Sequence, residues 1–116
     1  MMELSMSSCY YDDRSPEEAV ERLAKNGWIY MELSSEHGAN LLRRGDPESV
    51  GRKFRHFAEN AGLFIPQGHL WLNCDIAVPD QEEVVEQLKK WIDLFWRIGI
   101  RHAVLHPNSR PLYIIY

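Results

Sequence analysis

Residues 46–69, DPESVGRKFRHFAENAGLFIPQGH, contain the signals for one helix followed by one strand. Asp46 can cap the helix through its carboxylate, and Pro47 suits the first helical position because that residue needs no amide hydrogen. Gly62 can adopt the left-handed conformation that ends a helix. Residues 63–69 then form a short run typical of a strand. Between the start and the stop, apolar side chains recur at helical spacing, at Val50, Phe54, Phe57, Ala58 and Ala61.

The same unit is repeated on both sides of this stretch. Upstream, Ser15 is expected to cap a helix that starts with a proline and ends at Gly27. Downstream, Asp80 is expected to cap a third helix, which Gly99 ends. The capping-box positions of these two helices hold Glu18 and Glu83. Their expected inward faces are Ala19, Val20, Leu23 and Ala24 in the first, and Val84, Leu88, Trp91, Ile92, Phe95 and Ile98 in the second.

Each helix is bounded by strand-like runs, at residues 3–7, 28–34, 63–69 and 100–106. Alternation of strands and helices predicts parallel pairing through right-handed crossovers. The fold class is therefore α/β, a single domain over residues 1–116 with a parallel (βα)₃β arrangement. The long links, 8–15, 35–46 and 70–80, follow the strands, and in parallel sheets the carboxyl ends of the strands carry the chemistry. An open flavodoxin-like layer is an alternative, although no phosphate-binding glycine loop is present.

The composition excludes several classes of protein. The chain has 116 residues, 45% of them apolar and 26% charged, with a formal charge of −4, which is ordinary for a globular protein. The acidic balance gives no general attraction to nucleic acid. No leader or membrane-length apolar segment occurs, so we expect a cytoplasmic protein without a membrane partner. Cys9 and Cys74 have no metal-pair spacing and are interpreted as reduced thiols.

Two histidines occupy corresponding positions at the ends of consecutive strands. His69 closes the third strand-like run and His106 the fourth, whereas His37, His56 and His102 fall in a loop, on a helix and inside a strand. Adjacent parallel strands lie about 4.8 Å apart, so two such imidazoles can reach one ligand or one metal ion. We therefore expect His69 and His106 to contact a metal or a substrate.

Four segments resemble the xylose-isomerase-like barrel superfamily, which includes sugar-phosphate isomerases, epimerases and family 2 apurinic endonucleases. They are IPQGHLWL (65–72), IRHAVLHPNS (100–109), MELSSEHG (31–38) and LLRRGDPE (41–48). The resemblance implies the N-terminal half of a TIM (β/α)₈ barrel. It also implies a sugar or sugar-phosphate substrate and a divalent metal, Zn, Mn or Mg. In the endonuclease branch the positions of His69 and His106 bind zinc, and in the sugar branch they mostly contact substrate.

Further candidates surround these histidines. Glu32 corresponds to a Glu that often points inward in this superfamily, which makes it a weak catalytic candidate, or it faces water on an edge strand. Glu36 is a candidate for substrate contact, although Glu36 and His37 are interpreted first as solvated loop residues. Trp71 either stacks on a sugar or packs against the core. A basic group could meet a phosphate but is more typical of a solvated face; it consists of Arg43, Arg44, Arg52, Lys53 and Arg55.

Three functions are compatible with this pattern. The leading hypothesis is a sugar-phosphate isomerase or epimerase-like domain, incomplete because the family's catalytic strands five to eight are absent from this chain. The others are a non-catalytic half-barrel for binding or assembly and an apurinic-endonuclease-like hydrolase, which the acidic charge disfavours. Four parallel strands leave two unpaired edges, and residues 110–116 form an apolar tail. We therefore expect a homodimer that completes the barrel, unless the tail covers one edge as a fifth strand.

Overall fold

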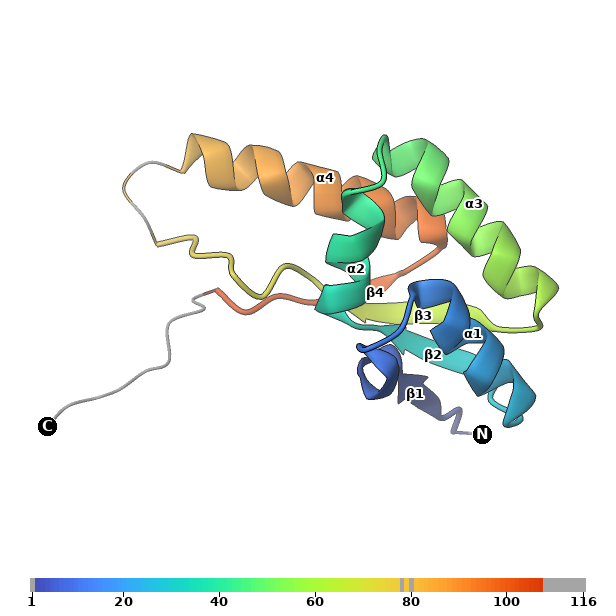
Figure 1. Cartoon of the computed structure of the whole chain (residues 1–116). Helices are drawn as coiled ribbons and strands as arrows, with labels where there is room; N and C mark the ends of the chain where they lie inside the picture. The colour runs from blue at the N-terminus through green and yellow to red at the C-terminus, as the bar shows by residue number, and fades with distance from the viewer. Residues whose placement is uncertain (1, 78, 80, 108–116) are drawn as a thin grey trace, which may run out of the picture.

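The computed structural model describes residues 2–77, 79 and 81–107. Within them the four strands are all parallel and lie in the order β1-β2-β3-β4 (Figure 1). This is the predicted α/β arrangement of strands and helices. The expected tail, residues 110–116, lies outside the described residues. The elements are β1 (Ser5–Ser7), a 3₁₀ turn η1 (Ser8–Tyr11), α1 (Pro16–Lys25), β2 (Tyr30–Leu33), α2 (Ser35–Leu42), α3 (Pro47–Asn60), β3 (Phe64–His69), α4 (Glu82–Ile98) and β4 (His102–Val104).

The predicted caps determine where α1 and α3 begin. The Ser15 hydroxyl accepts a hydrogen bond from the Glu18 amide at 3.1 Å, and the Asp46 carboxylate accepts one from the Ser49 amide at 3.0 Å. Helix α4 differs, because its N-cap residue is Gln81, whose side chain makes no capping bond. Asp80, the expected cap, lies outside the described residues.

Two expectations about the elements are wrong. Residues 35–46 were expected to be a loop, but α2 occupies most of them, because the Ser34 hydroxyl caps a helix by accepting from the His37 amide at 3.1 Å. Ile92 was expected to face inward, but it is 57% exposed, while Leu94 is fully buried. The buried stripe of α4 thus passes through Trp91, Leu94, Phe95 and Ile98.

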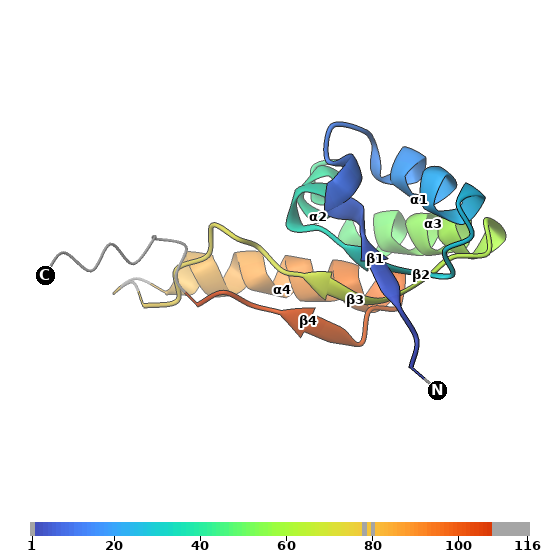
Figure 2. The same cartoon turned by 90° about the horizontal axis from the view of Figure 1, so that it is seen from below.

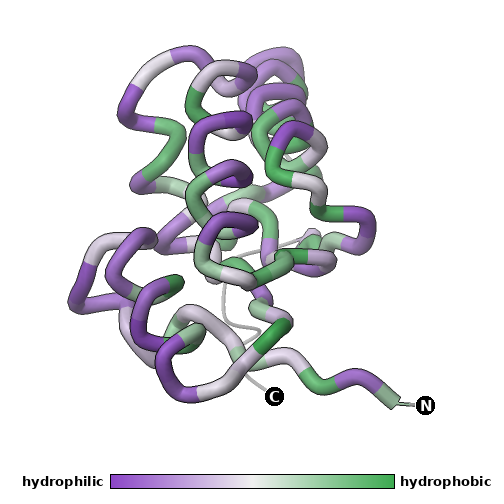
Figure 3. The backbone as a smooth tube through the Cα atoms, turned by 90° about the vertical axis from the view of Figure 1, so that its right-hand side faces the viewer, coloured by the Kyte–Doolittle hydropathy of each residue, from purple (hydrophilic) through white to green (hydrophobic). Residues whose placement is uncertain are grey.

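The helices α3 and α4 cover one face of the sheet, and in the described part of the chain Figures 1 and 2 show no helix on the opposite face. We call this opposite side the helix-free face. The hydrophobic core lies between the helices and the sheet, and includes Met31, Leu33, Phe54 and Phe95. Along the chain, hydrophobic and hydrophilic stretches alternate within the helices, as amphipathic packing requires (Figure 3).

Close helix packing requires small residues at the contact points. A Cβ atom on Gly51 of α3 would lie 2.6 Å from Cβ of Arg97 on α4. A Cβ atom on Gly68 of β3 would lie 2.9 Å from the ring of Phe95. These glycines let α4 lie against both α3 and β3.

The strand register places polar side chains on the helix-free face. Met31 and Leu33 of β2 are fully buried toward the helices, so the intervening Glu32 points the other way. Glu32 pairs with Gln67 across β2 and β3, and His69 pairs with Val104 across β3 and β4.

No helix among the described residues is long and apolar enough to span a membrane.

Candidate functional site at the carboxyl edge of the sheet

A pocket of about 460 Å³ lies where the four strands end. Three lining residues belong to strands, Ser7 to β1, Glu32 to β2 and His69 to β3, and His106 follows β4. The others lie in or beside η1 (Cys9 and Asp12), at the start of α2 or just before it (Ser34, Ser35 and Glu36) and in the loop after β3 (Leu72). The structure therefore brings together four residues singled out from the sequence, Glu32, Glu36, His69 and His106.

Glu32 is hydrogen-bonded through both of its carboxylate oxygens. Oε1 lies 2.6 Å from Nδ1 of His69, and Oε2 accepts a hydrogen bond from Nε2 of Gln67 at 2.8 Å. The Glu32 side chain is 18% exposed and that of His69 is 33% exposed. Glu32 belongs to an inner strand of the sheet, and its carboxylate orients the His69 ring at the edge of the pocket.

The ring of His106 stacks on that of His69. The ring centroids are 5.7 Å apart, and the planes are inclined by 17°. A metal centre needs further ligands, because zinc sites in proteins have at least three protein ligands. Within residues 2–77, 79 and 81–107, no three His, Cys, Asp or Glu side chains are grouped so that they could hold a metal ion. The residues present here therefore do not fit a metal centre by themselves.

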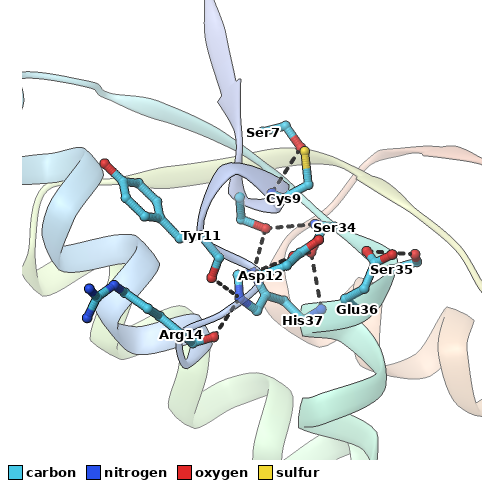
Figure 4. A network of polar contacts seen from close by, with 10 residues as sticks. Ser7, Cys9, Tyr11, Asp12, Arg14, Ser34, Ser35, Glu36 and His37 are labelled. Atoms are coloured by element: carbon cyan, nitrogen blue, oxygen red, sulfur yellow. Dashed lines mark hydrogen bonds and ion pairs between the residues drawn. The ribbon is translucent and has the colours of Figure 1, made fainter.

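His37 is buried and structural, which corrects its interpretation as a solvated loop residue. It is 2% exposed, and its Nδ1 lies 2.8 Å from the hydroxyl of Ser8. Its Nε2 lies 3.1 Å from the carbonyl oxygen of Tyr11 and 3.0 Å from that of Arg14 (Figure 4). Because carbonyl oxygens only accept, Nε2 carries the hydrogen and Nδ1 accepts from Ser8. This network joins the segment after β1 to the start of α2.

Asp12 lines the same pocket and was not singled out from the sequence. Its Oδ1 accepts a hydrogen bond from the Ser34 hydroxyl at 2.8 Å. Burial raises the pKa of the Asp12 carboxyl above its ordinary value, while the Ser34 bond opposes that shift. The only local sign was a pair of aspartates in the loop after the first strand, which is common in solvated loops.

Trp71 and the basic group lie elsewhere. Trp71 is half-buried against the hydrophobic core and is not among the residues that line the pocket. Arg44, Arg52 and Arg55 form ion pairs on the outer surface, with Glu17, Glu48 and Glu59 respectively. None of the five basic residues lines the pocket.

Comparisons with known proteins agree on the fold. The chain matches a D-psicose 3-epimerase solved in the presence of D-fructose, with a TM-score of 0.69 and 11% identity. It also matches the probable 3-DHS dehydratase AsbF, involved in petrobactin synthesis in Bacillus anthracis, with a TM-score of 0.65 and 19% identity. Each match covers 90% of this chain but only 37% and 38% of the respective neighbour. No protein-family model matches the chain, and neither does any curated protein sequence.

The chain therefore has the fold of part of these two neighbours, four parallel strands that alternate with helices, as the sequence predicted. The chain spans little more than a third of the length of either neighbour. At these identities the likeness concerns the fold, and the function has to be argued from the pocket.

Proposed function

We propose that this chain is the ligand-binding part of a sugar isomerase or epimerase-like barrel, and that the carboxyl-edge pocket takes a sugar. The observation that carries the proposal is the oriented pair of imidazoles, His69 and His106, at the strand ends. The lining also includes the hydroxyls of Ser7, Ser34 and Ser35. The Ser34 and Ser35 hydroxyls already donate to Asp12 and Glu36, and a hydroxyl oxygen has two lone pairs with which it can accept from a sugar hydroxyl. One structural neighbour is an epimerase solved with a sugar present.

The charge of the pocket favours a free sugar over a sugar phosphate. Among the described residues, the lining includes three carboxylates, Asp12, Glu32 and Glu36, and no lysine or arginine. A phosphate group would meet like charges without a compensating cation. The same argument disfavours a phosphodiester substrate and hence the endonuclease-like alternative.

Calorimetric titration with D-fructose tests this proposal. We expect binding at millimolar concentration or tighter, and we expect His69→Ala and His106→Ala each to weaken it by about tenfold, since each removes a polar partner of the ligand. His56→Ala is the matched control, because His56 is exposed on α3, remote from the pocket lining. D-Fructose 6-phosphate should bind more weakly than D-fructose. Absence of D-fructose binding to the wild-type chain, or equal losses in the control, would contradict the proposal.

A divalent cation enters the proposal only as a weak ligand. Two imidazoles leave Zn²⁺, Mn²⁺ or Mg²⁺ short of ligands, so we expect any binding to be weak and to depend on His69 and His106. Titration with Zn²⁺ checks this, and submicromolar affinity that survives replacement of both histidines by alanine would exclude them as ligands.

A non-catalytic binding or assembly module is the second candidate function. It is favoured by the contacts of Glu32, whose two oxygens each have a partner within the sheet, Gln67 and His69, as in a carboxylate that orients a neighbouring side chain. On this proposal the chain alone does not exchange a carbon-bound proton of D-fructose with solvent. Incubation in D₂O followed by mass spectrometry is the measurement, and deuterium in the recovered sugar that Glu32→Gln abolishes would show catalysis.

A further inference from the structure

The contact between Glu32 and His69 is built into the sheet. The parallel register places Glu32 opposite Gln67, two residues before His69 on the same side of β3. Gln67 donates to Oε2 at 2.8 Å, and His69 Nδ1 lies 2.6 Å from Oε1. The carboxylate is therefore held from two sides, which fixes its orientation relative to the His69 ring.

This contact determines which nitrogen of His69 faces the ligand. A carboxylate only accepts hydrogen bonds, so Nδ1 of His69 carries the hydrogen. In the neutral ring Nε2 then has a free lone pair. Among the described residues Nε2 of His69 has no hydrogen-bond partner, although the ring lines the pocket. The opposite tautomer occurs at His37, where two carbonyl oxygens require the hydrogen on Nε2.

We propose that Glu32 is a positioning residue that holds His69 with its hydrogen on Nδ1, so that Nε2 accepts a hydrogen bond from a ligand hydroxyl. The inference deepens the proposed function and rests on it for the identity of the ligand. The proposal gives the hydrogen bond between His69 and the ligand a direction: the ligand donates and Nε2 of His69 accepts. A ligand atom that can only accept, such as a carbonyl or ether oxygen, would find no donor at this nitrogen.

Nitrogen-15 spectra of the histidine rings at neutral pH test the tautomers directly. The two ring nitrogens of a neutral imidazole differ in chemical shift according to which one is protonated. We expect His69 to be protonated on Nδ1 and His37 on Nε2 in the wild-type chain. Protonation of His69 on Nε2 in the wild-type spectrum would overturn the proposal without the need for any variant.

Two matched substitutions separate the effect of the hydrogen bond between Glu32 and His69 from the effect of removing one negative charge from the pocket. Glu32→Met keeps the shape of the side chain but removes the acceptor, and we expect the His69 tautomer to shift toward Nε2–H. Glu36→Met makes the same chemical change in the same pocket at a carboxylate that does not contact His69, and should leave the tautomer unchanged. The buried His37 ring serves as the internal measure of folding in both variants. A His69 pattern that is unchanged in folded Glu32→Met would overturn the proposal.

D-Fructose titration of the same two variants completes the test. We expect Glu32→Met to weaken binding by about tenfold, because a ring with its hydrogen on Nε2 no longer accepts from the sugar hydroxyl, and Glu36→Met to lose less. Equal binding by the wild type and Glu32→Met would contradict the positioning role. Failure of D-fructose to bind the wild type would contradict the proposed function instead, while the tautomer spectra would still decide the inference.

Discussion

The ion pair between Glu17 and Arg44 joins α1 to the residues that follow α2. Nη2 of Arg44 donates to Oε2 of Glu17 at 2.9 Å. This hydrogen bond holds the pKa of the Glu17 carboxyl below its ordinary value. A depressed pKa in the folded state means that the contact stabilises the chain above the unfolded-state pKa, and that this contribution is lost as the pH falls through the folded-state value.

The first prediction concerns this acid dependence. Glu17→Gln should lower the free energy of unfolding at pH 7, and the difference from the wild type should shrink below about pH 4, where glutamates of the unfolded chain become protonated. Urea unfolding at pH 7 and pH 3 measures both values. Glu21→Gln is the control, because Glu21 lies exposed on the same helix. A Glu17→Gln effect that is equal at the two pH values would contradict the account.

Single residues in this chain differ in how far their roles could be predicted. His69 and His106 were expected near each other because both come at the end of a strand-like run, at matching places in consecutive repeats, and both line the pocket. The role of His37 was not predictable, because its partner Ser8 is 29 positions away in the sequence and becomes a neighbour only when β1 and β2 pair. The same holds for Asp12, whose contact with Ser34 depends on that pairing.

Among the elements, the contact between α3 and α4 depends on Gly51. A methyl group there would lie 2.6 Å from Cβ of Arg97 and 3.0 Å from the backbone oxygen of Leu94. We predict that Gly51→Ala destabilises the fold by ~1–3 kcal/mol despite the better helix propensity of alanine, because α3 and α4 must move apart.

Chemical denaturation measures this effect, with Lys53→Ala on the exposed side of α3 as the control. Lys53→Ala should change the free energy of unfolding by no more than about 0.5 kcal/mol. A Gly51→Ala variant as stable as the wild type would show that the packing of α4 on α3 is looser than described.

Helices α1 and α3, which have strong start and stop signals, could be predicted from the sequence. Helix α2, which has no glycine stop signal, could not. Helices α1 and α3 have side-chain caps and a following glycine with φ of 87° and 82°, respectively. Helix α2 has a capping serine but ends at Arg43, and its eight residues carry too few apolar positions to show a helical period. The strands are shorter than the apolar runs that predicted them, because pairing depends on the neighbouring strand and not on composition.

At the scale of the whole molecule, the sheet formed by the described residues has two edges without a paired strand and one face without a helix. β1 and β4 are the outer strands, and the helix-free face exposes apolar side chains such as Phe64 and Val104. We propose that a second copy of the chain covers this face, because two sets of four parallel strands supply the eight of a closed barrel.

Sedimentation equilibrium tests this proposal at micromolar concentration. We expect a species of twice the 13.6 kDa chain mass, and we expect Val104→Asp on the helix-free face to convert it to the monomer. Ile92→Asp is the matched control, since Ile92 is an exposed apolar residue on α4. A 13.6 kDa species that persists at high micromolar concentration would exclude the dimer.

We propose that the pocket at the carboxyl ends of the strands binds a sugar, and that the other pockets of the described residues do not. The most direct test is a map of amide chemical-shift changes in the nuclear magnetic resonance spectrum during titration with D-fructose. We expect the largest changes to cluster at residues that surround the pocket, Ser7, Asp12, Glu32, Ser34 and His69. Changes centred instead on the outer pocket between α3 and α4, lined by Arg52, His56 and Trp96, would contradict sugar binding at the strand ends. A spectrum that does not change at all would contradict sugar binding by the chain.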